Sequence, residues 1–224
     1  MNKELHNELK REFQLERMIL FSDAVFAIAI TLLVIEMKVP EIPHNLVTEQ
    51  SLVTGLAHLI PKFIGFLISF VLIGLYWTVH HRLFGFVVNF NQKLLWLNLF
   101  YLMGIVLMPF STGFYSEYIT HLLKSPVMIY VANISYIGIT NFILWKYVSN
   151  PKHRLTEGLN PQVSNYFSLR AITVPVIFII MALIYFIAPK LAVVIPLCIP
   201  ILMRLIFAPL KKRAIASINT GRQI

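Results

Sequence analysis

Charged residues and cysteines are both scarce in this sequence of 224 residues. Aspartate, glutamate, lysine and arginine make up 13% of it and hydrophobic residues 58%, whereas soluble proteins average about 25% charged residues. The single cysteine, Cys198, excludes a disulfide within one chain and argues against a cysteine-based metal site. A soluble domain is therefore not expected, and the long apolar runs predict an integral membrane protein.

Six apolar runs are each long enough to cross a bilayer, for which about 20 residues are needed. They predict an all-α membrane protein forming one six-helix domain over residues 1–224, with spans near 17–38, 52–80, 93–115, 126–147, 168–188 and 190–208. A charged helical arm over residues 2–16 is expected to continue into the first span. This arm lacks an apolar core, so no cleavable signal peptide is expected.

Acidic residues are also in the minority, and the net charge is +9. Fifteen of the lysines and arginines fall on the side of the two termini and three on the other side. By the positive-inside rule, this asymmetry predicts a multi-pass protein of the cell membrane with both termini in the cytoplasm. The basic charge is thus explained by topology and the lipid bilayer, and no nucleic-acid partner is expected.

The first span contains one acidic residue, Asp23, among apolar neighbours, and a carboxylate in hydrocarbon needs a partner or water. On a helical wheel of about 100° per residue, a bulky apolar stripe with one hydroxyl lies about 140° from Asp23. This stripe consists of Ile28, Thr31, Leu32 and Ile35. Asp23 therefore faces another helix or interfacial water. Candidate partners at the same depth are Trp77, His80, His81 and Asn98, while Arg17 lies about 120° away around the helix.

Motifs of enzymes and metal sites are missing. There is no GxSxG or HExxH sequence, and His80 and His81 point about 100° apart, so they cannot bind one metal as an i, i+4 pair does. We expect no enzyme activity, no cofactor and no resident metal. A small membrane enzyme or haem carrier built on the two histidines remains the least favoured alternative.

Several short stretches resemble one known family. Arg17, Phe21, Ser22 and Asp23, at the start of the first span, resemble the signature of the potassium channel family typified by lysosomal transmembrane protein 175. More specifically, they look like its prokaryotic members. YWTVHHRLF (76–84) and LWLNLFYLMGIVLMPFSTGF (95–114) look like that family's second and third spans. The resemblance covers most of residues 11–115 and beyond 120 depends on hydropathy and span count.

The resemblance implies a homotetramer in which the first span of each copy lines a pore without the TVGYG filter of other potassium channels. The pore constriction maps to Ile28, with Leu32 and Ile35 also facing the pore, and Thr31 maps to a hydroxyl layer linked to potassium preference. The remaining residues are implied to form a structural polar network: Arg17, Phe21, Ser22, Asp23, Trp77, His80, His81 and Asn98. The expected function is a leak-type potassium-selective channel that binds only permeant potassium ions. The alternative is a non-conducting membrane scaffold in which the stripe is a packing seam.

Overall fold

The computed structural model of the chain describes residues 2–157, 159–192, 195, 201–205 and 207–208, with side chains from residue 10 onward. The main helices are α1 (Asn2–Ile35), α2 (Glu49–His58), α3 (Ile60–Phe84), α4 (Gln92–Val106), α5 (Met108–Tyr118), α6 (Lys124–Val148), α7 (Pro161–Tyr185) and α8 (Pro189–Ala192). Three short 3-10 turns join them: η1 (His44–Leu46), η2 (Ile119–His121) and η3 (Pro151–His153). The predicted all-α fold is confirmed.

Five helical segments among the described residues are long and apolar enough to cross a membrane. They are Lys10–Ile35, Ile60–Phe84, Gln92–His121, Lys124–Val148 and Pro161–Tyr185. The charged arm joins the first of them as one helix, as expected. Residues 193–194, 196–200 and 206 of the predicted sixth span, 190–208, lie outside the described residues, and Cys198 is among them.

Two predicted spans are divided in the structure, and a proline follows each break. The apolar run at 52–80 contains two helices, because α2 ends at His58 and α3 begins at Ile60 with Pro61 in its first turn. The run at 93–115 is likewise interrupted between α4 and α5, where Pro109 lies in the first turn of α5. Proline lacks an amide hydrogen and its ring collides with the preceding turn, so it is accepted at a helix start.

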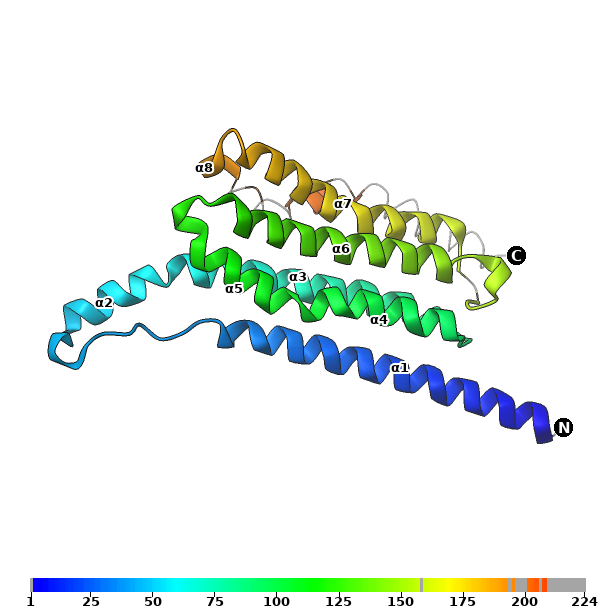
Figure 1. The fold of residues 1–224 in the computed structure, drawn as a ribbon. Helices are drawn as coiled ribbons and strands as arrows, with labels where there is room; N and C mark the ends of the chain where they lie inside the picture. The colour runs from blue at the N-terminus through cyan, green and yellow to red at the C-terminus, as the bar shows by residue number, and fades with distance from the viewer. Residues whose placement is uncertain (1, 158, 193–194, 196–200, 206, 209–224) are drawn as a thin grey trace.

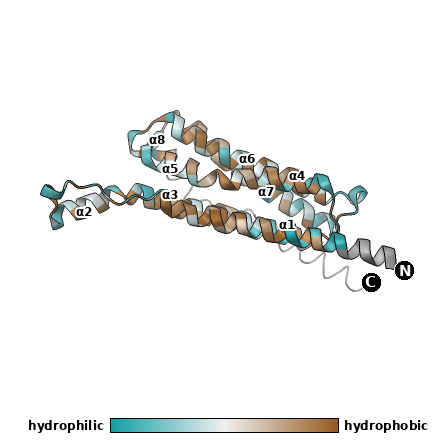
Figure 2. Cartoon of the chain, turned by 60° about the horizontal axis from the view of Figure 1, so that its bottom comes forward, coloured by the Kyte–Doolittle hydropathy of each residue, from teal (hydrophilic) through white to brown (hydrophobic). Residues whose placement is uncertain are grey.

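The long helices lie side by side in three layers (Figure 1). Helix α1 forms one outer layer and packs on α3, α4 and α5, which form the middle layer. The pair α6 and α7 forms the other outer layer, with α6 in contact with α4 and α5. Hydrophobic residues run along the middle of the long helices, whereas α2 and the connections at the ends are more hydrophilic (Figure 2). The arrangement fits a bundle that crosses the membrane along its long axis.

The turn between α3 and α4 is tied to the connection between α6 and α7. The backbone N–H of Val88 donates to the carbonyl of Leu155 at 2.9 Å, and the Asn89 side-chain amide donates to the carbonyl of Arg154 at 2.7 Å. These bonds satisfy loop groups that would otherwise lie at the end of an apolar bundle. They hold the C-terminal end of α3, where the candidate site begins, against the rest of the chain.

Candidate functional site

Helix α1 is held to the bundle by one narrow face. Its buried side chains recur every three or four residues, which places them on one side of the helix: Leu15, Met18, Ser22, Phe26, Ala29 and Leu33. Small Ser22 and Ala29 let the middle layer come close to the helix at two levels. Most of the remaining surface of α1 is exposed in the single chain.

A chain of hydrogen bonds crosses this face and joins α1, α4 and α3. Ser22 Oγ donates to the carbonyl of Met18 at 2.8 Å and accepts from Asn98 Nδ2 at 2.9 Å. Asn98 Oδ1 lies 2.8 Å from His80 Nε2. Because Asn98 presents its oxygen to the ring, His80 Nε2 carries the hydrogen. We call Ser22, Asn98 and His80 the polar anchor; all three are buried.

Aromatic rings surround the histidine of the polar anchor. The His80 ring stacks on Tyr101 with centroids 5.6 Å apart, and Phe84 and Phe26 lie 4.4 and 5.5 Å away. These rings exclude water, which strengthens the His80–Asn98 bond and makes any unpaired polar atom here costly. The environment suits a fixed structural histidine.

Asp23 has a partner of its own beside the polar anchor. The indole Nε1 of Trp77 donates to Asp23 Oδ1 at 2.9 Å, and His81 packs on the Trp77 ring with centroids 5.6 Å apart. Of the candidate partners named from sequence, only Trp77 hydrogen-bonds Asp23; Asn98 and His80 bond each other. The predicted single network is therefore two adjacent units, and the Asp23–Trp77 unit lies at the edge of the bundle, where Trp77 is exposed.

Arg17 and Phe21 are not part of either unit within one chain. The Arg17 guanidinium lies 5.6 Å from the ring of Phe13, one turn earlier on α1, and Phe21 is exposed. Both residues project from the side of α1 that carries Ile28, because Ile28 lies about three helical turns beyond Arg17 and about two beyond Phe21. Within the single chain, neither residue packs against the network as predicted, because α3 and α4 cover the opposite side of α1.

The stripe of α1 is uncovered. Ile28, Leu32 and Ile35 are 58%, 39% and 66% exposed, respectively, and Thr31 is exposed between them. The Thr31 hydroxyl donates back to its own helix, with the carbonyls of Ile28 and Ala27 at 2.9 and 3.0 Å. The structure thus places the stripe and the polar anchor on different sides of α1.

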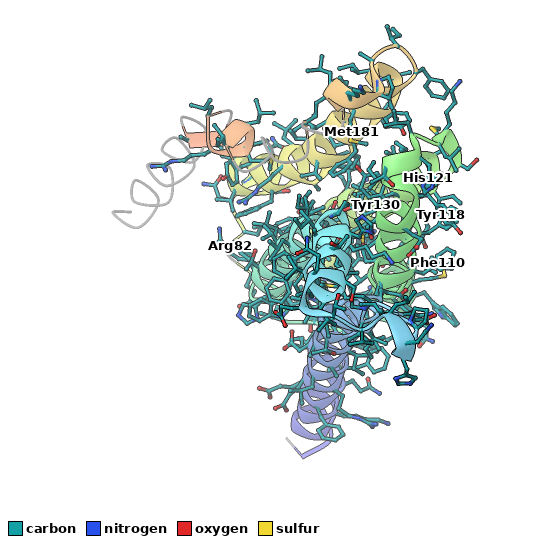
Figure 3. The ribbon with its side chains drawn as sticks, turned by 90° about the vertical axis from the view of Figure 1, so that its left-hand side faces the viewer. Arg82, Phe110, Tyr118, His121, Tyr130 and Met181 are labelled. Carbon is teal, nitrogen blue, oxygen red and sulfur yellow. The ribbon has the colours of Figure 1, made fainter. Side chains whose placement is uncertain are left out.

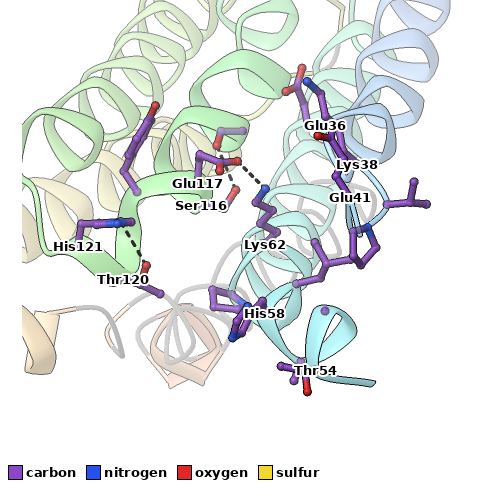
Figure 4. Close-up of a pocket in the computed structure, with 18 of the residues that line it drawn as sticks. Glu36, Lys38, Glu41, Thr54, His58, Lys62, Ser116, Glu117, Thr120 and His121 are labelled. Atoms are coloured by element: carbon purple, nitrogen blue, oxygen red, sulfur yellow. Dashed lines mark hydrogen bonds and ion pairs between the residues drawn. The ribbon is translucent and has the colours of Figure 1, made fainter. Parts of the chain in front are cut away.

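An outer cleft of about 1250 Å³ lies at the end of α1 that is remote from the N-terminus. Figure 4 shows its charged lining, which includes Glu36, Lys38 and Glu41 after α1. An ion pair links α3 to α5 here, with Lys62 Nζ 2.5 Å from Glu117 Oε2. The Glu36 carboxylate lies over Gly113, where an added Cβ would come within 2.7 Å of Glu36 Oε2. Among the described residues, no group of three or more His, Cys, Asp or Glu side chains could hold a metal ion.

Comparison with known proteins places this arrangement in a family. Residues 17–109 match the family model described as endosomal/lysosomal potassium channel TMEM175. A potassium channel of Chamaesiphon minutus is 37% identical over 138 residues, covering 61% of this chain and 67% of the relative. A potassium channel of a Chryseobacterium species is 34% identical over 154 residues, covering 66% of this chain and 74% of the relative. The chain belongs to the TMEM175 family.

A solved TMEM175 structure extends the match past residue 109. The crystal structure of a lysosomal potassium-selective channel TMEM175 homolog from Chamaesiphon minutus superimposes with a TM-score of 0.73 at 30% identity. It covers 87% of this chain and 98% of the solved chain. The TMEM175 fold therefore includes α6 and α7, for which the sequence offered only hydropathy. The resemblance first drawn from the FSD motif is confirmed.

Sequence analysis missed a second buried polar cluster in this TMEM175 chain. Ser69 Oγ on α3 lies 2.9 Å from the Tyr130 hydroxyl on α6, and the Thr112 hydroxyl on α5 donates to Ser69 at 2.7 Å. Nearby, the Asn133 side-chain amide donates to Ser111 Oγ at 3.0 Å. In the sequence, this cluster is visible only as isolated hydroxyl and amide residues within apolar runs. That signal is weak, because single hydroxyl residues are common in membrane helices.

Proposed function

We propose that this chain assembles as a homotetramer that forms a leak-type potassium-selective channel, with α1 of each copy lining a central pore. The observation that carries the proposal is the stripe: three bulky apolar side chains and one hydroxyl remain uncovered on a helix that is fixed by a buried polar anchor. Membership of the TMEM175 family and the potassium channel names of its relatives support the same assignment.

The stripe has the chemistry of a hydrophobic gate. In a tetramer, Ile28 and Leu32 would form two apolar rings on successive turns, and a narrow apolar neck can exclude water and stop ion flow. Ile35 would lie one turn further on, near the acidic Glu36 at the outer cleft. Because dewetting depends on the width of the neck, a small rotation of α1 would change conduction strongly.

Thr31 has the geometry of a cation ligand. Its hydroxyl hydrogen is occupied by backbone carbonyls of its own helix, so the oxygen can present lone pairs to a passing ion. A ring of four such oxygens replaces part of a hydration shell, and a single layer gives moderate selectivity. No arginine-rich voltage-sensing helix is present in the sequence, which agrees with a leak rather than steep voltage gating.

The same proposal sets the orientation of the protein. Both termini lie on the cytoplasmic side of the cell membrane, because the basic residues concentrate in the connections on that side. The polar anchor is then near the cytoplasmic face and the outer cleft near the external face.

The proposal is tested with purified protein in liposomes that contain a potassium gradient. We expect potassium flux and a bi-ionic reversal potential that favours potassium over sodium. Ile28→Asn should raise the flux because a polar ring keeps the neck wet. The control is Val34→Asn, an exposed position of α1 about 120° from Ile28, which should leave the flux unchanged. A folded tetramer without flux would indicate the scaffold alternative instead.

A further inference from the structure

Arg170 is a charged residue inside a membrane-length helix. It lies in α7, which is apolar enough to span the bilayer as Pro161–Tyr185, and it is half-buried. Within the described part of the chain, no carboxylate or hydrogen-bond acceptor contacts it; the ion pair present there, Lys62–Glu117, is at the outer end. A guanidinium at this depth is costly unless an anion or water meets it.

The sequence makes an internal counter-ion scarce. From residue 158 to the end of the sequence there are seven lysines and arginines and no aspartate or glutamate. Acidic groups on the same side of the bundle include Asp23, whose carboxylate is bonded to Trp77, and Glu157, which is exposed in the connection before α7. The negative charge that balances Arg170 is therefore expected to come from outside residues 158–224.

Arg170 lines a cleft between α3 and α7, which Met203 also lines. Helix α7 packs on α6 rather than on α3, so α6 forms the floor of the cleft. Apolar side chains alternate there with three polar groups from three helices: Tyr76, Asn141 and Arg170. Tyr76 is 5% exposed and its hydroxyl has no hydrogen-bond partner, and Asn141 is 2% exposed. A buried hydroxyl without a partner normally needs an explanation.

A second cation, Arg82, lies about one helical turn beyond Val79, which lines the cleft on α3. The Arg82 guanidinium, near the inner end of α3, lies 5.1 Å from the ring centroid of Phe167 on α7. Phe167 and Arg170 are three residues apart and so lie on the same side of α7. Figure 3 shows Arg82 on the opposite side of the molecule from Phe110 and Tyr118, on the side of residues 201–205. Arg170 thus lines the cleft and Arg82 lies about one helical turn from it, and the residues that line the cleft include no carboxylate.

We propose that this cleft binds an anionic phospholipid from the leaflet on the N-terminal side, with its phosphate against Arg170 and Arg82. Basic pockets between membrane helices on the cytoplasmic side have the charge that acidic headgroups need. The enclosed part of the cleft, about 30 Å³, is water-sized. The phosphate therefore lies at the mouth, and a phosphate oxygen or its hydration water reaches Tyr76 and Asn141.

The test compares lipid binding to the purified full-length chain by native mass spectrometry. Phosphatidylglycerol should bind in preference to phosphatidylcholine. Arg170→Gln should reduce that preference about five-fold, the factor that corresponds to about 1 kcal/mol per basic side chain. The matched control is Lys152→Gln, which removes an exposed charge of η3 on the same side of the bundle and should change nothing.

Two further variants keep the test decisive if Arg170→Gln fails to fold. Tyr76→Phe removes a hydroxyl that has no partner, so the fold should persist while the preference for phosphatidylglycerol falls. Arg82→Gln should also lower it. The proposal is overturned by equal binding of the two lipids, by an equal loss in Lys152→Gln, or by inorganic phosphate displacing the lipid, which would indicate a site for free anions. No ion gradient is involved, so the result is independent of channel activity.

Discussion

Asn98 gives a partner to one polar group on each of two neighbouring helices. Its amide donates to Ser22 on α1, and its oxygen meets His80 Nε2 on α3, in a region from which aromatic rings exclude water. A residue that donates and accepts at once in such a place is hard to replace, because leucine fills the volume but leaves the imidazole N–H unpaired.

We therefore expect Asn98→Leu to lower the free energy of unfolding by about 2 kcal/mol, the range for one buried group left without a partner. Denaturant unfolding in detergent micelles measures this change. Asn165→Leu, on the exposed surface of α7, is the control and should cost far less. Equal losses in the two variants would show that the polar anchor contributes nothing specific.

Asp23 is expected to act through structure and not through ion binding. In Asp23→Ala the Trp77 N–H loses its acceptor, which should lower stability by about 1 kcal/mol because Trp77 is partly solvated or lipid-exposed. Asp23→Asn keeps an acceptor oxygen and should retain most of the stability. The potassium-to-sodium permeability ratio in liposomes should be unchanged in both. A stable assembly of Asp23→Ala with an altered ratio contradicts this role.

The sequence was sufficient to separate Asp23 from the stripe, because both lie on one helix whose geometry is known. It could not select the partner of Asp23. Trp77, His80 and Asn98 lie at similar depth, and α3 is apolar around its whole circumference, so no periodic pattern shows how it is rotated. The division into a buried Ser22–Asn98–His80 unit and an exposed Asp23–Trp77 unit needed the packed structure.

At the scale of helices, α6 and α7 approach each other closely at Gly138. A Cβ added to Gly138 would lie 1.9 Å from Pro175 Cγ and 3.0 Å from the carbonyl oxygen of Ala171. Both neighbours belong to α7, and neither a proline ring nor a backbone carbonyl can turn away as a flexible side chain can. Glycine at this position therefore sets the spacing of the outer layer.

Gly138→Ala should separate α6 from α7 and lower stability by about 1–3 kcal/mol, the usual cost of overpacking. Gly74→Ala is the matched control, since nothing lies within 4 Å of an added Cβ there, and its higher helix propensity should leave stability equal or slightly raised. Thermal unfolding of both variants in the same detergent compares them. Similar melting temperatures would mean that the two helices can move apart without cost.

Hydropathy located the membrane segments but not the ends of the helices. The run at 52–80 is apolar throughout, and only Pro61 indicates that α3 begins anew after Leu59. The same holds for Pro109 between α4 and α5. Proline is tolerated inside membrane helices, as Pro175 within α7 shows, so its presence alone does not decide between a kink and a new helix.

For the whole molecule, the main question is what covers the stripe of α1. Apolar side chains at the membrane surface of one chain are compatible with lipid, with a packing seam and with a pore, and the sequence pattern is the same in each case. The structure shows that α3, α4 and α5 of the same chain pack on the other side of α1, so they do not cover the stripe. The described helices therefore leave the stripe open to lipid, to ions and water, or to another copy of the chain.

Cysteine crosslinking distinguishes these surroundings. Ile35 and Val34 are neighbours on α1 and both are exposed, yet they point about 100° apart. In a Cys198→Ala background, which has no other cysteine, Ile35→Cys should be joined between copies by a short thiol-reactive crosslinker. Val34→Cys should not, because it faces away from the proposed axis. Non-reducing gels of membranes give the readout. Equal crosslinking at both positions would reflect random collision, and crosslinking at Val34→Cys alone would place the axis on another face of α1.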